Sequence, residues 1–172
     1  NEIIQAMKER RSCRKYQDTM IPKEDLEEII EAGLYAANGM GKQSPIIVAV
    51  TNKEVRDELS KMNAAVMGSE NDPFYGAPVV LIVLADKSVR TEVYDGSLVM
   101  GNLMLACDAK GIGSCWIHRA KEEFESEEGK ALLKKLGIEG DYEGIGHCVL
   151  GYRADEKPVP APRKDNRVFW CE

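Results

Sequence analysis

The fold is decided by residues 79–85, which read Val79-Val80-Leu81-Ile82-Val83-Leu84-Ala85 without a polar interruption. A continuous apolar run of this length is typical of a strand in the interior of a sheet. Residues 92–110 are apolar on most sides of a helix, which predicts a buried central helix.

The sequence around these two elements completes an α+β pattern. A helical stripe of apolar residues ends just before Arg10, and Pro22 opens a second helix. The buried face of that second helix is expected to hold Leu26, Ile29, Ile30, Gly33 and Leu34. Further helices are predicted around residues 55–66 and 124–136, and strands at 46–51, 114–118 and 145–152. The chain, residues 1–172, is predicted to form one domain.

Composition and charge restrict the function. The net charge of −6 argues against a general nucleic-acid binder, because binding a phosphate backbone needs a broad basic face. The five cysteines are odd in number and contain no CxxC pair, so free thiols in a reducing cytoplasm are expected rather than disulfides. No apolar run is long enough for a signal peptide or membrane span, so we expect a soluble, cytoplasmic protein.

One stretch has the chemistry of an anion site. The basic segment, Arg10-Arg11-Ser12-Cys13-Arg14, places three guanidiniums and a hydroxyl within five residues. Guanidinium groups hold phosphate oxygens through paired, charge-assisted hydrogen bonds. The segment is therefore a candidate phosphate site, and the alternative is a solvated surface or a loose nucleic-acid patch.

The C-terminal tail, residues 154–172, has an unusual composition. Three prolines, at positions 158, 160 and 162, favour an extended conformation, yet the tail ends in Val168-Phe169-Trp170. Such an apolar end is expected to dock on the core of its own chain or on a second subunit. Arg163, Lys164 and Arg167 provide a second basic group that could meet the first in space.

Several catalytic motifs are excluded. The run Gly39-Met40-Gly41-Lys42-Gln43-Ser44 has Gln43 where a phosphate-binding loop needs a hydroxyl, and Gly111-Ile112-Gly113 lacks the third glycine of a dinucleotide motif. Strand alternation separates Cys115 from His118 and His147 from Cys148, so no metal site is expected. A phosphate site without a catalytic set of side chains indicates that a bound cofactor performs the chemistry.

An ordered set of motifs covering nearly the whole chain resembles the FMN-dependent nitroreductase family. The set comprises Arg10-Arg11-Ser12-Cys13-Arg14-Lys15-Tyr16, Pro22, residues 36–43, Ala77-Pro78, Asn102-Leu103-Met104-Leu105-Ala106 and Gly111-Ile112-Gly113-Ser114-Cys115-Trp116. The resemblance implies a central, mostly antiparallel sheet flanked by helices. It also implies an intertwined homodimer, with a C-terminal arm crossing to the partner and FMN held in the interface by both chains.

The resemblance further implies three groups of flavin-binding residues. The first group holds the phosphate and ribityl chain and consists of Arg10, Arg11, Ser12, Arg14 and Arg163. The second group reaches the flavin of the other subunit and consists of Ala37, Asn38 and Gly39, with Gln43 at the family's glutamine position. The third group lies along the isoalloxazine ring through its backbone and consists of Cys115, Trp116, Ile117, His118 and Arg119.

The chain departs from the family pattern at two places that bear on the site. Ala161 stands where the family often has a lysine, which leaves Lys164 as the substitute candidate. Gly41-Lys42-Gln43-Ser44-Pro45 lacks an asparagine and a tryptophan found in many relatives, so the resemblance does not fix the substrate preference. The loop at residues 68–76 leaves little sequence for a lid over the flavin.

The leading hypothesis is an FMN-dependent oxidoreductase with a ping-pong mechanism. NAD(P)H would reduce FMN, and an electron-poor acceptor such as a nitroaromatic or quinone would then take the electrons. One alternative is a flavin enzyme with another redox reaction, such as dehalogenation or ring oxidation. Others are a non-catalytic flavin-binding or sensing module and a nucleic-acid accessory protein that uses the basic termini.

Overall fold

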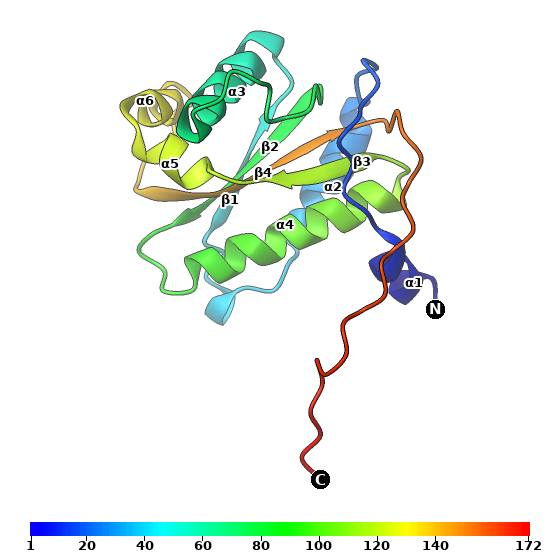
Figure 1. The fold of residues 1–172 in the computed structure, drawn as a ribbon. Helices are drawn as coiled ribbons and strands as arrows, with labels where there is room; N and C mark the ends of the chain where they lie inside the picture. The colour runs from blue at the N-terminus through cyan, green and yellow to red at the C-terminus, as the bar shows by residue number, and fades with distance from the viewer.

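The apolar run forms an interior strand, as predicted. It is β2 (Val79–Asp86), the second strand of a four-stranded antiparallel sheet of order β1-β2-β4-β3 (Figure 1). Its neighbours are β1 (Pro45–Val50) and β4 (Tyr142–Gly151), while β3 (Gly113–Ile117) forms the far edge. The structure, a computed structural model, describes residues 1–172. Both faces of β2 are covered, which explains why residues 79–85 contain no polar side chain.

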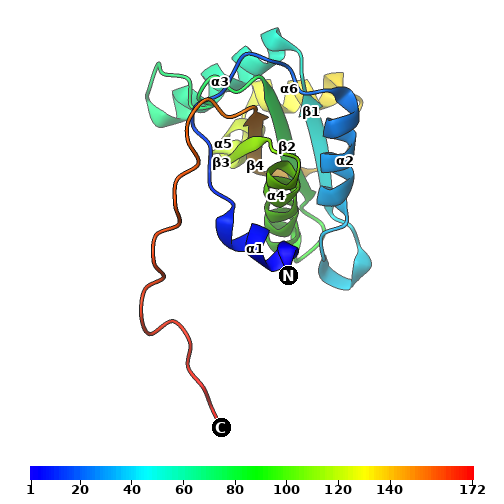
Figure 2. The same ribbon diagram turned by 90° about the vertical axis from the view of Figure 1, so that its right-hand side faces the viewer.

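One face of the sheet packs against α2 (Lys23–Leu34) and α4 (Glu92–Ala109). Leu81 of β2 belongs to the same apolar cluster as Ile29 of α2 and Leu103 of α4. In Figure 2 these two helices lie on the same side as the short N-terminal helix α1 (Glu2–Glu9). We call this side the open face, because it leaves apolar residues exposed.

The opposite face packs against α3 (Lys53–Met67), α5 (Ala120–Glu125) and α6 (Glu127–Lys135) (Figure 1). We call it the closed face. The single helix predicted at residues 124–136 is wrong, because Ser126 has an extended backbone and separates α5 from α6. Its side chain accepts a hydrogen bond from Gly129 N, so Ser126 caps α6 and ends the preceding helix.

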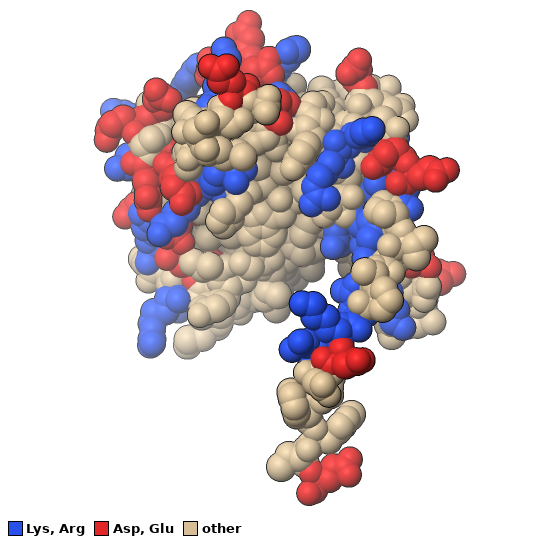
Figure 3. All heavy atoms as spheres, viewed as in Figure 1, with Lys and Arg blue, Asp and Glu red and all other residues tan.

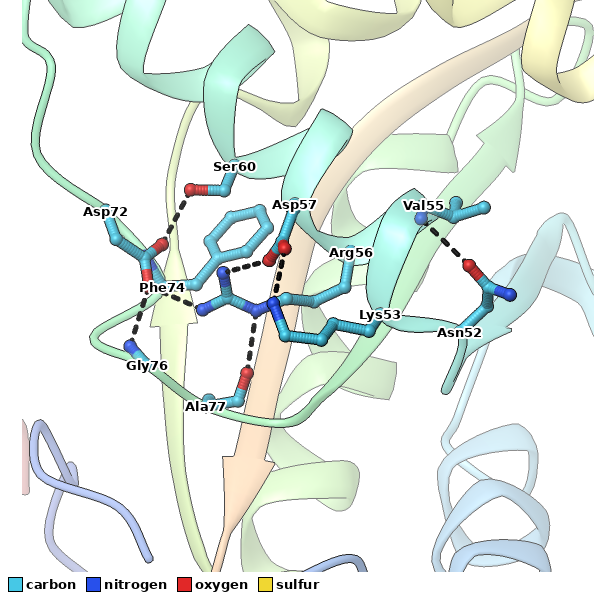
Figure 4. Close-up of polar contacts among 10 residues, drawn as sticks. All are labelled: Asn52, Lys53, Val55, Arg56, Asp57, Ser60, Asp72, Phe74, Gly76 and Ala77. Atoms are coloured by element: carbon cyan, nitrogen blue, oxygen red, sulfur yellow. Dashed lines mark hydrogen bonds and ion pairs between the residues drawn. The ribbon is translucent and has the colours of Figure 1, made fainter. Parts of the chain in front are cut away.

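A buried polar cluster fastens the loop before β2 to the closed face (Figure 4). The Asp72 carboxylate accepts hydrogen bonds from Arg56 Nη2 at 2.5 Å and from Ser60 Oγ at 2.6 Å, and Arg56 Nε donates to the Ala77 carbonyl at 2.9 Å. Phe74 is fully buried beneath these contacts. The loop at residues 68–76 is therefore held against α3 and contains no helix of its own.

The central helix α4 is less buried than predicted. Val99, Met100 and Leu103 are buried against the sheet, but Tyr94 is 73% exposed and Leu98 is 50% exposed. Leu34, expected on the buried face of α2, is also exposed, and α1 contains no buried residue. The sequence pattern predicted the apolar character of these helices correctly, but the single chain leaves part of their apolar surface exposed.

The C-terminal tail does not dock on its own chain. Beyond β4 it has no helix or strand and extends away from the body (Figure 1). Phe169 is 85% exposed and Trp170 is 83% exposed. Of the two docking places expected from the sequence, the chain's own core is therefore excluded.

Two further properties concern the whole chain. All five cysteines are free. None of the helices is both long and apolar enough to cross a membrane.

Candidate functional site

The basic segment is fixed along the outer edge of the sheet. Arg10 ends α1, and Cys13 N then donates a hydrogen bond of 2.8 Å to the Ser114 carbonyl of β3. Gly113 permits this approach, because a Cβ at that position would lie 2.8 Å from Cys13 Sγ. The segment thus covers the start of β3 and has a defined backbone position.

The guanidiniums of the basic segment have different surroundings. Arg11 donates from Nε and Nη2 to the Arg10 and Lys8 carbonyls, so it helps to complete the end of α1. The Arg14 side chain is exposed and makes no hydrogen bond within the chain. Arg10 Nη1, in contrast, is buried and has no hydrogen-bond partner. A buried guanidinium nitrogen is costly to leave unpaired, so this atom is suited to an anionic ligand.

Arg153 is a cation of this region that the sequence did not single out. Its Nη2 donates to the Arg11 carbonyl at 3.0 Å and the Ser12 carbonyl at 3.2 Å, and its Nη1 pairs with Asp155 at 2.8 Å. These bonds attach the start of the tail to the basic segment. A single arginine after a strand carries no sequence signal for such a contact.

The second basic group does not contact the first through its side chains in this chain. Arg163 donates only to the nearby Ala161 carbonyl. In Figure 3, Lys and Arg side chains gather on the side of the molecule on which α1 and the tail lie, with some Asp and Glu side chains among them. The two basic groups therefore share a side of the molecule.

Residues 115–119 occupy the end of β3 and the turn that follows. Cys115 and Ile117 are buried on the closed face, while Trp116 lies half-buried on the open face. Gly146 of β4 accommodates the indole ring, because a Cβ there would lie 2.5 Å from Trp116 Nε1. The backbone N–H groups of His118 and Arg119 donate to no other backbone group. The turn therefore offers two backbone donors at the sheet edge.

The basic segment and residues 115–119 lie on the same edge of the sheet. Cys148 is paired with Trp116 in the strand register. The basic segment is bonded to the same strand as Trp116, because Cys13 N donates to the carbonyl of Ser114, two residues before Trp116. One ligand could therefore contact both groups of residues.

The loop containing Ala37, Asn38 and Gly39 is fastened by a buried carboxylate. Asp95 of α4 accepts hydrogen bonds from Gly39 N at 2.9 Å, Ser44 Oγ at 2.7 Å and Thr91 Oγ1 at 2.9 Å. Burial raises the pKa of Asp95, but these three hydrogen bonds outweigh it and leave the pKa below its ordinary value. The loop is thus rigidly attached, with Asn38 Oδ1 also accepting from Gln43 N at 2.9 Å.

Within one chain this loop lies far from the basic segment. It contacts Thr91 and Asp95 at the start of α4, whereas the basic segment packs beside Gly113, just beyond the end of that helix. The fifteen residues from Asp95 to Lys110 span about 22 Å at the helical rise of about 1.5 Å per residue. The structure therefore brings the basic segment of the first predicted group to the same sheet edge as the third group and separates the second group from them, while Arg163 remains in the extended tail.

Asp95, Asn63 and Glu123 were not singled out from the sequence, and His147 was considered only as a metal ligand. Each is a buried polar residue, and its spacing along the sequence does not distinguish a fastening role from exposure. No group of three His, Cys, Asp or Glu side chains is arranged to hold a metal ion. The site consists of cations, backbone donors and one half-buried aromatic ring.

Comparisons with known proteins agree on one family. The model of the nitroreductase family matches residues 7–73 and 64–152. A crystal structure of a nitroreductase with bound FMN from Bacteroides fragilis is 29% identical, with a TM-score of 0.90 over 100% of both chains.

Two curated relatives extend this result. An Archaeoglobus fulgidus protein, assigned provisionally by its name to the NADH dehydrogenase/NAD(P)H nitroreductases, is 32% identical over 91% of this chain and 88% of its own. A Bacillus subtilis protein named FMN reductase (NAD(P)H) is 25% identical over 90% of this chain and 67% of its own. The fold, the sequence and the names of the relatives thus agree on the nitroreductase family.

Proposed function

The chain belongs to the nitroreductase family, and on that premise we propose that it is an FMN-dependent oxidoreductase with NAD(P)H as electron donor. We further propose that it works by a ping-pong mechanism with a nitroaromatic, quinone or similar electron-poor compound as acceptor. The observation that carries the proposal is the buried, unpaired Arg10 Nη1 at the sheet edge. The FMN-bound relative and the FMN reductase support the identity of the ligand.

In this proposal the basic segment holds the phosphate. Arg10 donates from its buried nitrogen, Arg14 supplies an exposed cation, and Ser12 supplies a hydroxyl that makes no hydrogen bond within the chain. Arg11 contributes mainly through its backbone, because two of its guanidinium nitrogens are bonded to carbonyls of α1. Arg163 joins from the tail once the tail has docked.

Residues 115–119 hold the ring in this proposal. The N–H groups of His118 and Arg119 donate to its hydride-accepting edge, and Trp116 packs against the flavin region from β3. Bound FMN supplies the electron and hydride transfer chemistry, which protein side chains lack. In this proposal the chain's own residues bind, orient and shield the ring.

A second copy of the chain completes the site. Ala37, Asn38, Gly39 and Gln43 lie about 22 Å from the basic segment of their own chain, so we propose that they reach the flavin of a partner. The exposed flank of α4 and the exposed stripe of α1 provide the apolar surface of a homodimer. The tail, residues 154–172, crosses to the partner.

An absorbance scan of the purified protein tests the cofactor. We expect a flavin spectrum, or its appearance after FMN is added and unbound FMN is removed. Steady consumption of NADH or NADPH should then require an acceptor, and a panel of nitroaromatics, quinones and halogenated phenols would identify its class. Protein that neither carries nor takes up FMN would overturn the proposal. Bound FMN that neither nicotinamide reduces would instead favour a sensing module.

A further inference from the structure

A chain of buried polar side chains crosses the closed face and ends at the proposed flavin turn. His147 of β4, Glu123 of α5 and Asn63 of α3 are all buried. Glu123 Oε2 is hydrogen-bonded to His147 Nε2 at 2.5 Å and accepts from Asn63 Nδ2 at 2.8 Å. Three polar residues in an apolar layer are costly unless they are paired or serve another purpose.

Stability alone does not account for this arrangement. Glu123 Oε1 and His147 Nδ1 are buried without a hydrogen-bond partner, and a buried polar atom left unpaired lowers stability. At this end the network therefore stops at Glu123 and His147. Its remaining hydrogen bonds lead through Asn63 to the turn after β3.

Asn63 holds that turn through two hydrogen bonds, one to its backbone and one to a side chain. Its Nδ2 donates to the His118 carbonyl at 2.8 Å, and its Oδ1 accepts from the side-chain Nε of Arg119 at 2.9 Å. These neighbours determine the orientation of the amide, because a backbone carbonyl only accepts and an arginine only donates. Glu123 accepts from the same Nδ2 and so supports this orientation.

The backbone that Asn63 holds is strained. Arg119 has φ of 77°, a left-handed conformation that side chains other than glycine rarely adopt. Such a conformation persists only where its surroundings hold it in place. The strained peptide is also the one whose neighbouring N–H groups, on His118 and Arg119, face no backbone acceptor.

We propose that Asn63 is a positioning residue for the flavin, oriented by Glu123 and His147. It fixes the turn at His118 and Arg119 so that the backbone N–H groups of these two residues are aligned before the ring binds. This inference rests on the proposed function. Preorganised donors accelerate a reaction because no reorganisation is needed during the step, whereas a displacement of about 1 Å can cost a hundredfold in rate.

Ser60 provides a matched control on the same helix. It lies one turn before Asn63, is buried, and also donates to a carboxylate, that of Asp72. The Asp72 cluster holds the loop before β2 and makes no hydrogen bond to residues 115–119. Ser60→Ala should therefore lower stability without disturbing the turn.

The experiment compares Asn63→Ala, Ser60→Ala and the wild type. Trypsin cleavage after Arg119, followed by mass spectrometry without added FMN, should be at least about tenfold faster in Asn63→Ala only, because cleavage requires the turn to open. In FMN-loaded protein, single-turnover reduction by the preferred nicotinamide should slow by about tenfold to a hundredfold in Asn63→Ala only. The visible spectrum of FMN should shift in the same variant.

Arg119→Gly is the second variant in case Asn63→Ala does not fold. Glycine adopts the left-handed conformation freely and removes the side-chain bond to Asn63, so reduction should again slow. Because Arg119→Gly removes the trypsin site itself, its readouts are the reduction rate and the FMN spectrum, and cleavage after Arg119 is compared only among Asn63→Ala, Ser60→Ala and the wild type. Reduction equal to the wild type in the variants that fold, or cleavage equal to the wild type in Asn63→Ala, would overturn the proposal. A wild type that binds no FMN would overturn the proposed function, while cleavage of Asn63→Ala would still decide whether Asn63 holds the turn.

Discussion

The two faces of the sheet differ in how far one chain completes them. On the closed face, α3, α5 and α6 cover the sheet, and Arg56, Ser60 and Asp72 satisfy one another in a buried cluster. On the open face, α1 buries no residue, the flank of α4 is exposed, and a guanidinium nitrogen of Arg10 is buried without a partner. The proposed second subunit and anionic ligand would complete this face.

The largest expected effect comes from removing the tail, which the open face is proposed to need. A variant ending at Asp155 loses Phe169 and Trp170, and each large apolar side chain contributes roughly 1.5–3 kcal/mol when buried. It also loses Arg163. We expect a monomer by light scattering and loss of FMN from the purified protein, with the circular dichroism of the body retained. A truncated protein that stays dimeric with full flavin content would show that the tail does not complete this face.

A substitution that disrupts the closed face should change stability and not FMN binding or oligomeric state. Arg56→Ala removes the partner of Asp72 and one donor to Ala77, and should lower the free energy of unfolding by about 2–3 kcal/mol in urea titrations. FMN content and oligomeric state should not change. Lys53→Ala on the same helix is the control, because its exposed pair with Asp57 contributes at most about 1 kcal/mol. Equal effects of both variants would contradict the importance of the buried cluster.

Some elements of the fold were predictable from the sequence, and others were not. The apolar run of β2, the helix opened by Pro22 and the order of strands were visible because burial on a regular element leaves a periodic pattern. The break at Ser126 was missed because the charged residues around it fit one helix as well as two. The exposed flank of α4 was missed because an apolar sequence pattern does not say which apolar side chains the chain's own core covers.

The candidate site was predictable only where residues are adjacent in the chain. The basic segment is a local cluster, so its chemistry could be read directly. Asp95 and Asn63 act on loops 55 or more residues away in sequence, and Arg153 is joined to Arg11 across 142 residues. Hydrogen bonds between such distant residues are set by the fold, and one sequence contains no record of them.

The open face can be tested further by comparing two neighbouring arginines. Arg10→Ala should weaken FMN affinity by at least about tenfold, equivalent to about 1.4 kcal/mol, because it removes a buried donor that has no other partner. Arg11→Ala should affect FMN less, since its guanidinium is bonded to carbonyls of α1. Fluorescence titration of the flavin would measure both. An unchanged FMN affinity in Arg10→Ala would indicate that the basic segment is a solvated surface and not a phosphate site.

The smallest expected effect is on the free energy of unfolding at low pH, and it depends on Asp95 of the open face. Hydrogen bonds from Ser44, Gly39 and Thr91 leave the pKa of Asp95 below its ordinary value although burial opposes them. The folded state therefore gains stability from the ionised carboxylate above the unfolded-state pKa of about 3.9, and loses it as pH falls through the lower, folded-state pKa.

Asp95→Asn isolates this contribution, because the amide keeps the shape of the side chain but does not titrate. Its unfolding free energy should fall less steeply than that of the wild type as pH decreases below about 4. Asp18→Asn is the control, since Asp18 is exposed and makes no side-chain hydrogen bond. Urea titrations at successive pH values would give both slopes. If Asp95→Asn followed the wild-type curve, the three hydrogen bonds to this carboxylate would not discriminate between its ionised and neutral forms, and the loop would be held by packing around Gly39 and Thr91.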